Sequence, residues 1–157
     1  EITGLPAGLG EPVFEKLDAN LAKAMMSIGA VKGVEIGDGF LASLAYGSQN
    51  NDAFYMEEGY VSKRTNHSGG ILGGMSDGSS VRLRVAIKPT PSIFQSQQTV
   101  NNRGEDIEIQ IKGRHAPVIV PRAVVVVECM AAITVMDALL ANMTSRMDRI
   151  LKFYETL

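Results

Sequence analysis

A glycine-rich segment, residues 65–78, carries the clearest signal for ligand chemistry in the sequence. It reads TNHSGGILGGMSDG and holds five glycines in fourteen positions. Glycine tolerates positive φ angles and lets backbone N–H groups approach a ligand, so successive exposed amides can surround an anion. Tight turns or close packing of strands explain paired glycines equally well. The segment is neither a Walker loop, since no Gly-Lys-Ser/Thr follows, nor a dinucleotide-binding fingerprint, since its spacing differs.

Two further segments combine basic and hydroxyl residues at turns. KPTPS, residues 88–92, ends a strand-like run, so that Lys88, Thr90 and Ser92 could be presented to a phosphate. KGRHAP, residues 112–117, precedes a helical run, where an anion would also interact with the helix N-terminus. Solvated turns explain each segment when it is taken alone. If the strands bring the three segments to one end of a sheet, they favour an anionic small molecule as ligand.

The remaining reactive side chains indicate no other chemistry. A single cysteine, Cys129, forms no internal disulfide, and we expect it to be buried in a helix. The two histidines, His67 and His115, are far apart in sequence and show no zinc-site spacing. Each is interpreted as a hydrogen-bonding structural residue. We therefore predict no metal site.

Composition indicates one globular domain. The chain has 157 residues, is 45% hydrophobic and carries a formal net charge of −2. Its 15 basic and 17 acidic residues are interleaved, which argues against nucleic-acid binding. The longest apolar run, near residues 123–127, is too short to span a bilayer, and no signal peptide is visible, so a cytoplasmic location without membrane contact is expected. The opening EITGLPAGLGEP lacks methionine and runs at once into a turn, which suggests a fragment of a longer protein.

Hydrophobic periodicity defines the elements that would position these segments. The expected elements are, in chain order, a helix from Pro12 to Ile28, short strands within residues 30–40 and 41–48, a surface loop over 48–63, strands at 81–88 and 107–112, and a long helix over 121–153. The strand at 81–88 alternates strictly between apolar and polar residues, and it could pair with the strand at 107–112 as a hairpin or as a sheet neighbour. The last helix is apolar nearly all round at first, which predicts burial by a sheet or by another subunit. The fold class is therefore α+β, with helices packed on a largely antiparallel sheet.

Five segments of the sequence resemble a known family in their order and spacing. They are GLGEPVFEKLDANLAKAMMSIGAVKGVEIGDGF, GSQNND, TNHSGGILGGMSDG, AIKPTPSI and KGRHAPVIVPRAVVVVECMAA. Together they resemble the C-terminal half of chorismate synthase, from Gly4 to about Leu140. The resemblance implies that residues 1–157 form the C-terminal portion of a chorismate synthase-like domain whose N-terminal half is absent. Its implied fold is part of a β-α-β sandwich, with an antiparallel sheet and packed helices.

The resemblance also implies an activity. It is the anti-1,4-elimination of phosphate from 5-enolpyruvylshikimate 3-phosphate (EPSP), which gives chorismate in the shikimate pathway of aromatic amino-acid biosynthesis. The family requires reduced FMN, which is not consumed overall, and its members are homotetramers.

Flavin-contacting positions can be carried over from the family residue by residue. They are Gly29, Ala30, Gly73, Lys88, Pro89, Thr90, Pro91, Ser92 and Arg114. The glycines would let the backbone lie close to the flavin or its phosphate, and the two cations would supply charge for bound anions. No catalytic residue is assigned, because the family's histidine-bearing motifs lie in the half that this sequence lacks.

The sequence departs from the family pattern at four positions. Ala116 stands where an aspartate implicated in proton transfer usually follows Arg-His, and an alanine cannot move a proton. Gly29 replaces a usual Pro or Asn, Pro91 a small hydroxyl residue, and Val118 a common Cys. Two alternatives therefore remain beside a weakly active enzyme portion: a non-catalytic relic that folds and oligomerises without flavin turnover, and an unrelated anion-binding α+β module.

Overall fold

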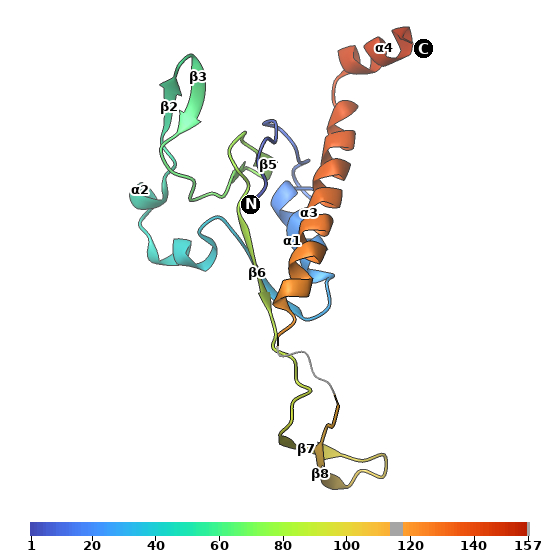
Figure 1. Cartoon of the computed structure of the whole chain (residues 1–157). Helices are drawn as coiled ribbons and strands as arrows, with labels where there is room; N and C mark the ends of the chain where they lie inside the picture. Colours follow the sequence, from blue (N-terminus) through green and yellow to red (C-terminus); the bar gives the residue numbers. More distant parts are fainter. Residues whose placement is uncertain (114–117, 157) are drawn as a thin grey trace.

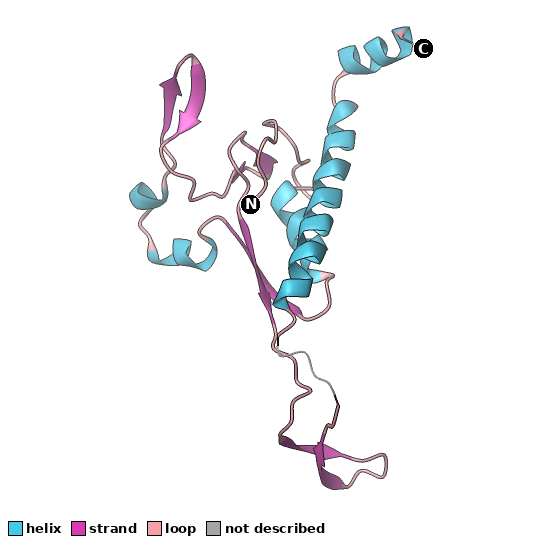
Figure 2. Ribbon diagram, viewed as in Figure 1, coloured by secondary structure: helices cyan, strands magenta, loops and turns pink. Residues whose placement is uncertain are grey.

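The computed structural model describes residues 1–113 and 118–156 of the chain. Within these residues the helices are α1 (Leu17–Met26), a 3-10 helix (Gly39–Leu44), α2 (Gly47–Asn50), α3 (Val120–Met143) and α4 (Met147–Glu155). The strands are β1 (Val31–Ile36), β2 (Phe54–Glu57), β3 (Tyr60–Lys63), β4 (Ile71–Leu72), β5 (Met75–Ser76), β6 (Leu83–Ile87), β7 (Ser96–Val100) and β8 (Asp106–Gln110). The strands pair as four two-stranded antiparallel sheets, so the predicted α+β class is confirmed (Figures 1 and 2).

The pair β1–β6 forms the central ribbon of the molecule. Its register places Val34 opposite Val85 and Ile36 opposite Leu83, with an irregularity between Val31 and Gly33. Side chains of β6 alternate between half-buried and exposed, as its sequence predicts. The apolar face of the ribbon packs toward α1, because a strand places every second side chain on the same face.

The hydrophobic core lies between α1, the ribbon and α3. Leu17, Leu21 and Met25, spaced four residues apart on one face of α1, are fully buried. The expected start of this helix at Pro12 is wrong. Val13 and Phe14 are instead 72% and 89% exposed in a turn closed by paired backbone hydrogen bonds between Glu11 and Glu15. Because Val13 and Phe14 continue the apolar spacing of α1, the sequence pattern wrongly extended the predicted helix toward Pro12.

Three further expectations about local structure are corrected. Residues 41–48 form the 3-10 helix and α2 instead of a strand, and residues 48–63 hold the β2–β3 hairpin instead of an irregular loop. The strand expected at 107–112 is observed as β8. Its partner is β7 and not β6, and β7 itself lies in a stretch that was expected to be a turn. The β7–β8 hairpin projects away from the core in Figure 1. Local pairing prevails there because a short connection brings β7 and β8 together at little entropic cost.

The C-terminal part consists of two helices instead of the single helix expected. The long helix ends at Met143, and α4 begins at Met147 after a short bend. Arg149 fixes this bend, since its guanidinium donates hydrogen bonds to the backbone oxygen (3.1 Å) and the side-chain oxygen (2.9 Å) of Asn142.

Helix α3 packs along α1 (Figure 1). Most of its apolar side chains are nevertheless exposed in this chain. Among its residues only Ala131 is buried, and Val125 and Ile133 are 60% and 64% exposed. Cys129, expected to be buried, is exposed. By length and composition alone the 24-residue helix could cross a membrane, a test that core helices of soluble proteins also pass. The expectation that no apolar segment reaches that length is therefore corrected.

Candidate functional site

Two of the predicted flavin-contacting segments meet at one end of the central ribbon. Gly29 and Ala30 precede β1, and residues 88–92, named here the KPTPS loop, follow β6. The backbone N–H of Lys88 donates a hydrogen bond to the carbonyl oxygen of Ala30, with a distance of 2.8 Å. This bond extends the antiparallel ladder beyond Val31 and Ile87, so antiparallel pairing is what brings the two segments together.

Both segments carry features typical of ligand sites. Ala30 has a φ angle of 70°, in the left-handed region that disfavours residues with a Cβ atom. Backbone strain of this kind occurs often at functional sites. The Oγ1 atom of Thr90 is buried and has no hydrogen-bond partner among the described residues. A buried hydroxyl without a partner is costly unless a ligand or water satisfies it, so Thr90 marks a place where an acceptor or donor is expected.

The other predicted positions lie elsewhere or outside the described residues. Gly73 occupies the turn between β4 and β5 with a φ angle of 59°, and a Cβ atom there would meet nothing within 4 Å. The adjoining Gly74 carbonyl accepts the backbone N–H of Leu17 (2.8 Å), so this turn lies at the start of α1, whereas Ala30 follows the end of α1. The ten residues of α1 span about 15 Å. The structure therefore does not bring Gly73 next to the KPTPS loop. Arg114 lies outside the described residues, and the flavin-contacting assignments stay predictions.

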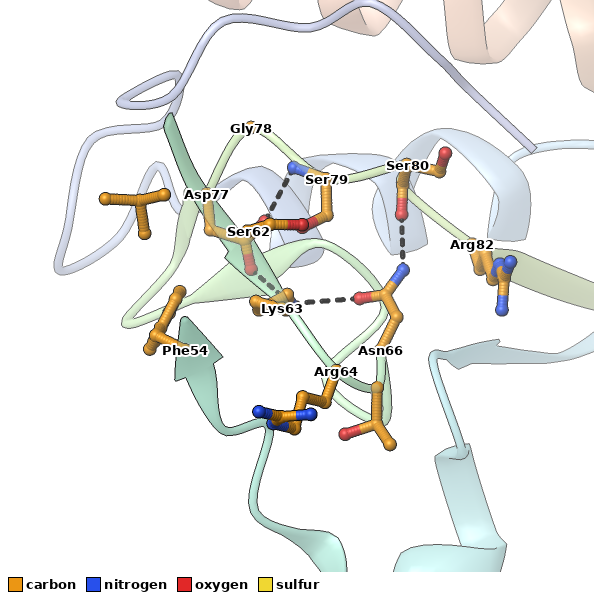
Figure 3. Close-up of a pocket in the computed structure, with 12 residues that line it drawn as sticks. Phe54, Ser62, Lys63, Arg64, Asn66, Asp77, Gly78, Ser79, Ser80 and Arg82 are labelled. Atoms are coloured by element: carbon orange, nitrogen blue, oxygen red, sulfur yellow. Dashed lines mark hydrogen bonds and ion pairs between the residues drawn. The ribbon is translucent and has the colours of Figure 1, made fainter. Parts of the chain in front are cut away.

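A buried ionic network, which the sequence analysis missed, joins the β2–β3 hairpin to the glycine-rich segment. The ammonium group of Lys63 donates hydrogen bonds to Asp77 (2.6 Å), Asn66 (3.0 Å) and Ser68 (3.1 Å), and it lies 3.6 Å from Asp52. The Lys63, Asp52 and Asp77 side chains are 3%, 4% and 8% exposed. Figure 3 shows the Lys63 side chain pointing from the hairpin toward Asp77 and Asn66. We name Lys63, Asp52 and Asp77 the buried triad.

Both carboxylates of the buried triad are held ionised. Burial acts to raise the pKa of Asp52, but the pKa lies well below its ordinary value because the carboxylate accepts hydrogen bonds from the backbone N–H of Ser68 and His67 and from the Thr65 hydroxyl. Burial likewise opposes ionisation of Asp77, and the Lys63 ammonium group lowers the pKa of Asp77 on balance. The charge of Lys63 is therefore paired with two carboxylates, while Asn66 and Ser68 accept its remaining hydrogen bonds.

The lowered pKa of Asp52 predicts an acid-dependent loss of stability. A carboxylate whose pKa is lower in the folded than in the unfolded chain stabilises the fold above its ordinary pKa, here 3.8, and that stability is lost as the pH falls below it. We expect Asp52→Asn to cost about 1–3 kcal/mol at pH 7, because an amide leaves the backbone donors poorly paired. We also expect its unfolding free energy to fall less steeply than wild type between about pH 4 and pH 2. Urea unfolding across this pH range measures both effects, and identical pH slopes for variant and wild type would contradict the assignment.

A second interaction fixes the histidine of the glycine-rich segment. The Nδ1 atom of His67 lies 2.6 Å from a carboxylate oxygen of Asp38, and the His67 carbonyl accepts the backbone N–H of Asp38 (2.9 Å). The interpretation of His67 as a hydrogen-bonding residue is confirmed. Asp38 follows β1 at the end opposite Ala30, so this pair does not face the KPTPS loop.

The arrangement provides two separate regions with binding chemistry. One is the end of the ribbon, with a cation and hydroxyl groups on the KPTPS loop and a strained backbone at Ala30. The other is the hairpin end, where the buried triad holds the glycine-rich segment in place. Within the described residues, no group of three or more metal-ligating side chains is present.

Comparison with known proteins identifies the relatives of this chain. The sequence profile of chorismate synthase matches residues 1–140. The chain is 73% identical over 156 residues to the chorismate synthase of Agathobacter rectalis and 64% identical over 153 residues to that of Lachnospira eligens. These alignments cover 99% and 98% of this chain and 42% of each relative.

A solved structure agrees with these relatives. A crystal structure of chorismate synthase superposes with a TM-score of 0.72 at 35% identity, covering 98% of this chain and 40% of that chain. The chain thus spans about two fifths of the length of the relatives that it matches. It belongs to the chorismate synthase family.

Proposed function

We propose that this chain is part of a chorismate synthase, which eliminates phosphate from EPSP to give chorismate with reduced FMN as cofactor. The observation that carries the proposal is the hydrogen bond between Lys88 and Ala30, which joins two segments that the family resemblance assigns to the flavin. Membership of the family supports the reaction class. When bound, reduced FMN supplies an electron-rich ring system to the elimination and is not consumed overall.

The residues at the end of the ribbon fit an anionic cofactor. Lys88 is exposed and can pair its ammonium group with a phosphate. The hydroxyl of Thr90, which has no partner among the described residues, can donate to a cofactor oxygen or accept from a ring N–H. Two prolines restrict the backbone of the loop, so little conformational entropy is lost when it binds. The role of these residues at the end of the ribbon is to bind and orient the cofactor.

Substitutions in the KPTPS loop test this role. We expect Lys88→Gln to raise the Kd for FMN about tenfold, because a charge-assisted hydrogen bond is lost. The isosteric change Thr90→Val removes only the hydroxyl, and we expect it to raise the Kd about threefold to tenfold. Titration of the chain with FMN, followed by flavin fluorescence, measures both. Lys23→Gln, at an exposed position in the last turn of α1, is the matched control and should leave the Kd unchanged. Equal affinity in all four proteins would refute the assignment.

The alternative is a relic that folds and oligomerises without flavin turnover. It is motivated by the alignments, which cover 42% of each relative, and by Ala116, which stands where the family resemblance implies an aspartate. The FMN titration separates the two proposals, because a relic would bind no FMN. Formation of chorismate from EPSP, followed by its absorbance, then tests the activity itself.

We also propose that the chain works in a cytoplasmic homo-oligomer, a tetramer by family resemblance. The exposed apolar surface of α3 supports burial against further protein. That surface would be covered either by other parts of a longer chain or by a neighbouring subunit, as expected for a helix that is apolar nearly all round.

A further inference from the structure

A glutamine side chain of the β7–β8 hairpin holds the KPTPS loop. The Nε2 atom of Gln97, in β7, donates a hydrogen bond to the backbone carbonyl oxygen of Pro91, with a distance of 2.9 Å. The two residues lie six positions apart in the sequence. The bond therefore ties the second proline of the loop to the start of the hairpin.

The KPTPS loop depends on such support because its backbone makes few hydrogen bonds. Pro89 and Pro91 have no N–H group to donate. Within the described part of the chain, the loop forms one backbone–backbone hydrogen bond, from Lys88 to Ala30 at its start. A segment with few hydrogen bonds opens locally at a low cost in free energy. We therefore expect the bond from Gln97 to decide how well the loop keeps its conformation.

The exposure of β7 also singles out Gln97. It is the half-buried residue of this strand, and the other four residues are exposed, among them Val100 at 62%. Burial of a side-chain amide is costly unless it is hydrogen-bonded, and the carbonyl of Pro91 meets this need. The strand thus buries a polar side chain against the loop and leaves a valine in solvent, which hydrophobic packing does not explain.

The hairpin gives Gln97 an ordered base. Strands β7 and β8 pair over their whole length, with Gln97 opposite Ile109. Their connection is closed by the side-chain oxygen of Asn101, which accepts the backbone N–H of Arg103 (2.9 Å) and that of Glu105 (3.0 Å). The hairpin therefore keeps its own shape although it projects from the core (Figure 1).

The two attachments of the loop lie on either side of Thr90 in the sequence. Ala30 holds Lys88 before it, and Gln97 holds Pro91 after it. The buried Oγ1 atom of Thr90 has no hydrogen-bond partner among the described residues. A hydroxyl on a backbone that is already ordered binds a ligand with a smaller loss of entropy.

We propose that Gln97 is a positioning residue, which holds the KPTPS loop in the conformation that presents the Thr90 hydroxyl to the flavin. The inference rests on the proposed function and adds a residue that the family resemblance does not place at the flavin. Gln97 acts through the carbonyl of Pro91 and does not itself contact the cofactor. The β7–β8 hairpin then serves as the support of a binding loop.

Titration of the full chain with FMN, followed by flavin fluorescence, tests this role. Gln97→Met keeps the length of the side chain but removes the donor, and we expect it to raise the Kd about threefold to tenfold while the urea midpoint stays unchanged. Gln98→Met, at the adjacent exposed position, is the matched control and should leave the Kd as in wild type. An equal rise in both variants would mean general damage to β7 and would overturn the inference.

The isosteric change Gln97→Glu adds a pH-dependent test. At pH 7 a carboxylate cannot donate to the Pro91 carbonyl, so FMN binding should be weakened at least as much as in Gln97→Met. A protonated carboxyl group regains an O–H donor, so the ratio of the variant Kd to the wild-type Kd should shrink as the pH falls from about 7 to about 4.5. Gln97→Met and Gln98→Glu should show no such recovery. A ratio that does not change with pH would contradict a hydrogen bond to the loop.

A double variant tests whether Gln97 acts through Thr90. If it does, Thr90→Val/Gln97→Met should raise the Kd by less than the product of the two single effects. Independent effects that multiply would show that Gln97 does not position Thr90.

The same titrations separate this inference from the flavin assignment. If Lys88→Gln and Thr90→Val weaken FMN binding but Gln97→Met and Gln97→Glu do not, the positioning role is wrong and the flavin assignment stands. If Gln97→Met weakens binding and Thr90→Val does not, Gln97 does not act through Thr90, and the inference is again wrong. If none of the four variants changes the Kd, the flavin assignment fails and the positioning role fails with it.

Discussion

Replacing Lys63 by methionine is expected to lower the free energy of unfolding by about 3–5 kcal/mol, the cost of removing one partner of a buried ion pair. Methionine fills a similar volume but leaves Asp52 and Asp77, both almost inaccessible to solvent, without their cation. Since a domain of this size is stable by about 5–15 kcal/mol, the loss should be visible as a large fall in the urea midpoint. Far-ultraviolet circular dichroism during urea titration measures it.

Two further variants make the Lys63 experiment specific. Lys32→Met, at an exposed position in β1, removes a lysine of the same length and should change stability by less than about 0.5 kcal/mol. The double variant Lys63→Met/Asp77→Asn should be more stable than Lys63→Met alone. In it the Asp77 charge is removed together with the Lys63 charge that compensates it, so one fewer buried carboxylate is left unpaired. A loss below about 1 kcal/mol for Lys63→Met would mean that water, not Lys63, compensates the two carboxylates.

Gly37→Ala is expected to cost about 3 kcal/mol, from the left-handed backbone conformation and from steric overlap. Gly37 has a φ angle of 58°, and a Cβ atom there would press against the backbone of His67, Ser68 and Gly69. None of these atoms can move easily, because the carbonyl of His67 accepts the N–H of Asp38 and the N–H of Gly37 itself donates to Arg82 (both 2.9 Å). Thermal or urea unfolding measures the cost.

Gly59→Ala is the matched control for Gly37. Gly59 also has a positive φ angle, 88°, but a Cβ atom there would meet nothing within 4 Å. It should therefore show only the conformational cost, about 1–2 kcal/mol. The difference between the two variants isolates the close approach of the glycine-rich segment to the end of β1. Equal costs for both would show that the segments are not in contact in solution.

The sequence was a reliable guide where a local period decides the structure. Strand β6 was predicted because its apolar and polar residues alternate over its whole length, and the ribbon buries one of its two faces. The buried face of α1 followed from the spacing of Leu17, Leu21 and Met25. The start of α1 could not be predicted in this way, because Val13 and Phe14 continue the apolar pattern although they lie in an exposed turn. Hydrophobicity alone does not tell whether a side chain finds a partner in this chain.

The buried triad was not predictable in the same way. Asp52, Lys63 and Asp77 lie in polar stretches that read as surface, and their pairing depends on how a hairpin folds back on the glycine-rich segment. Such contacts, between residues 11 and 14 positions apart in sequence, leave no periodic signal. The flavin-contacting positions came from family resemblance, and the structure brings only some of them together.

The uncovered surface of α3 has a consequence for any measurement on this chain. When apolar side chains such as Val125 and Ile133 are buried by association, assembly and folding are linked by mass action. The melting temperature then rises with protein concentration, and a value measured at one dilution does not describe the chain at another. Stability comparisons between variants therefore belong at one fixed concentration.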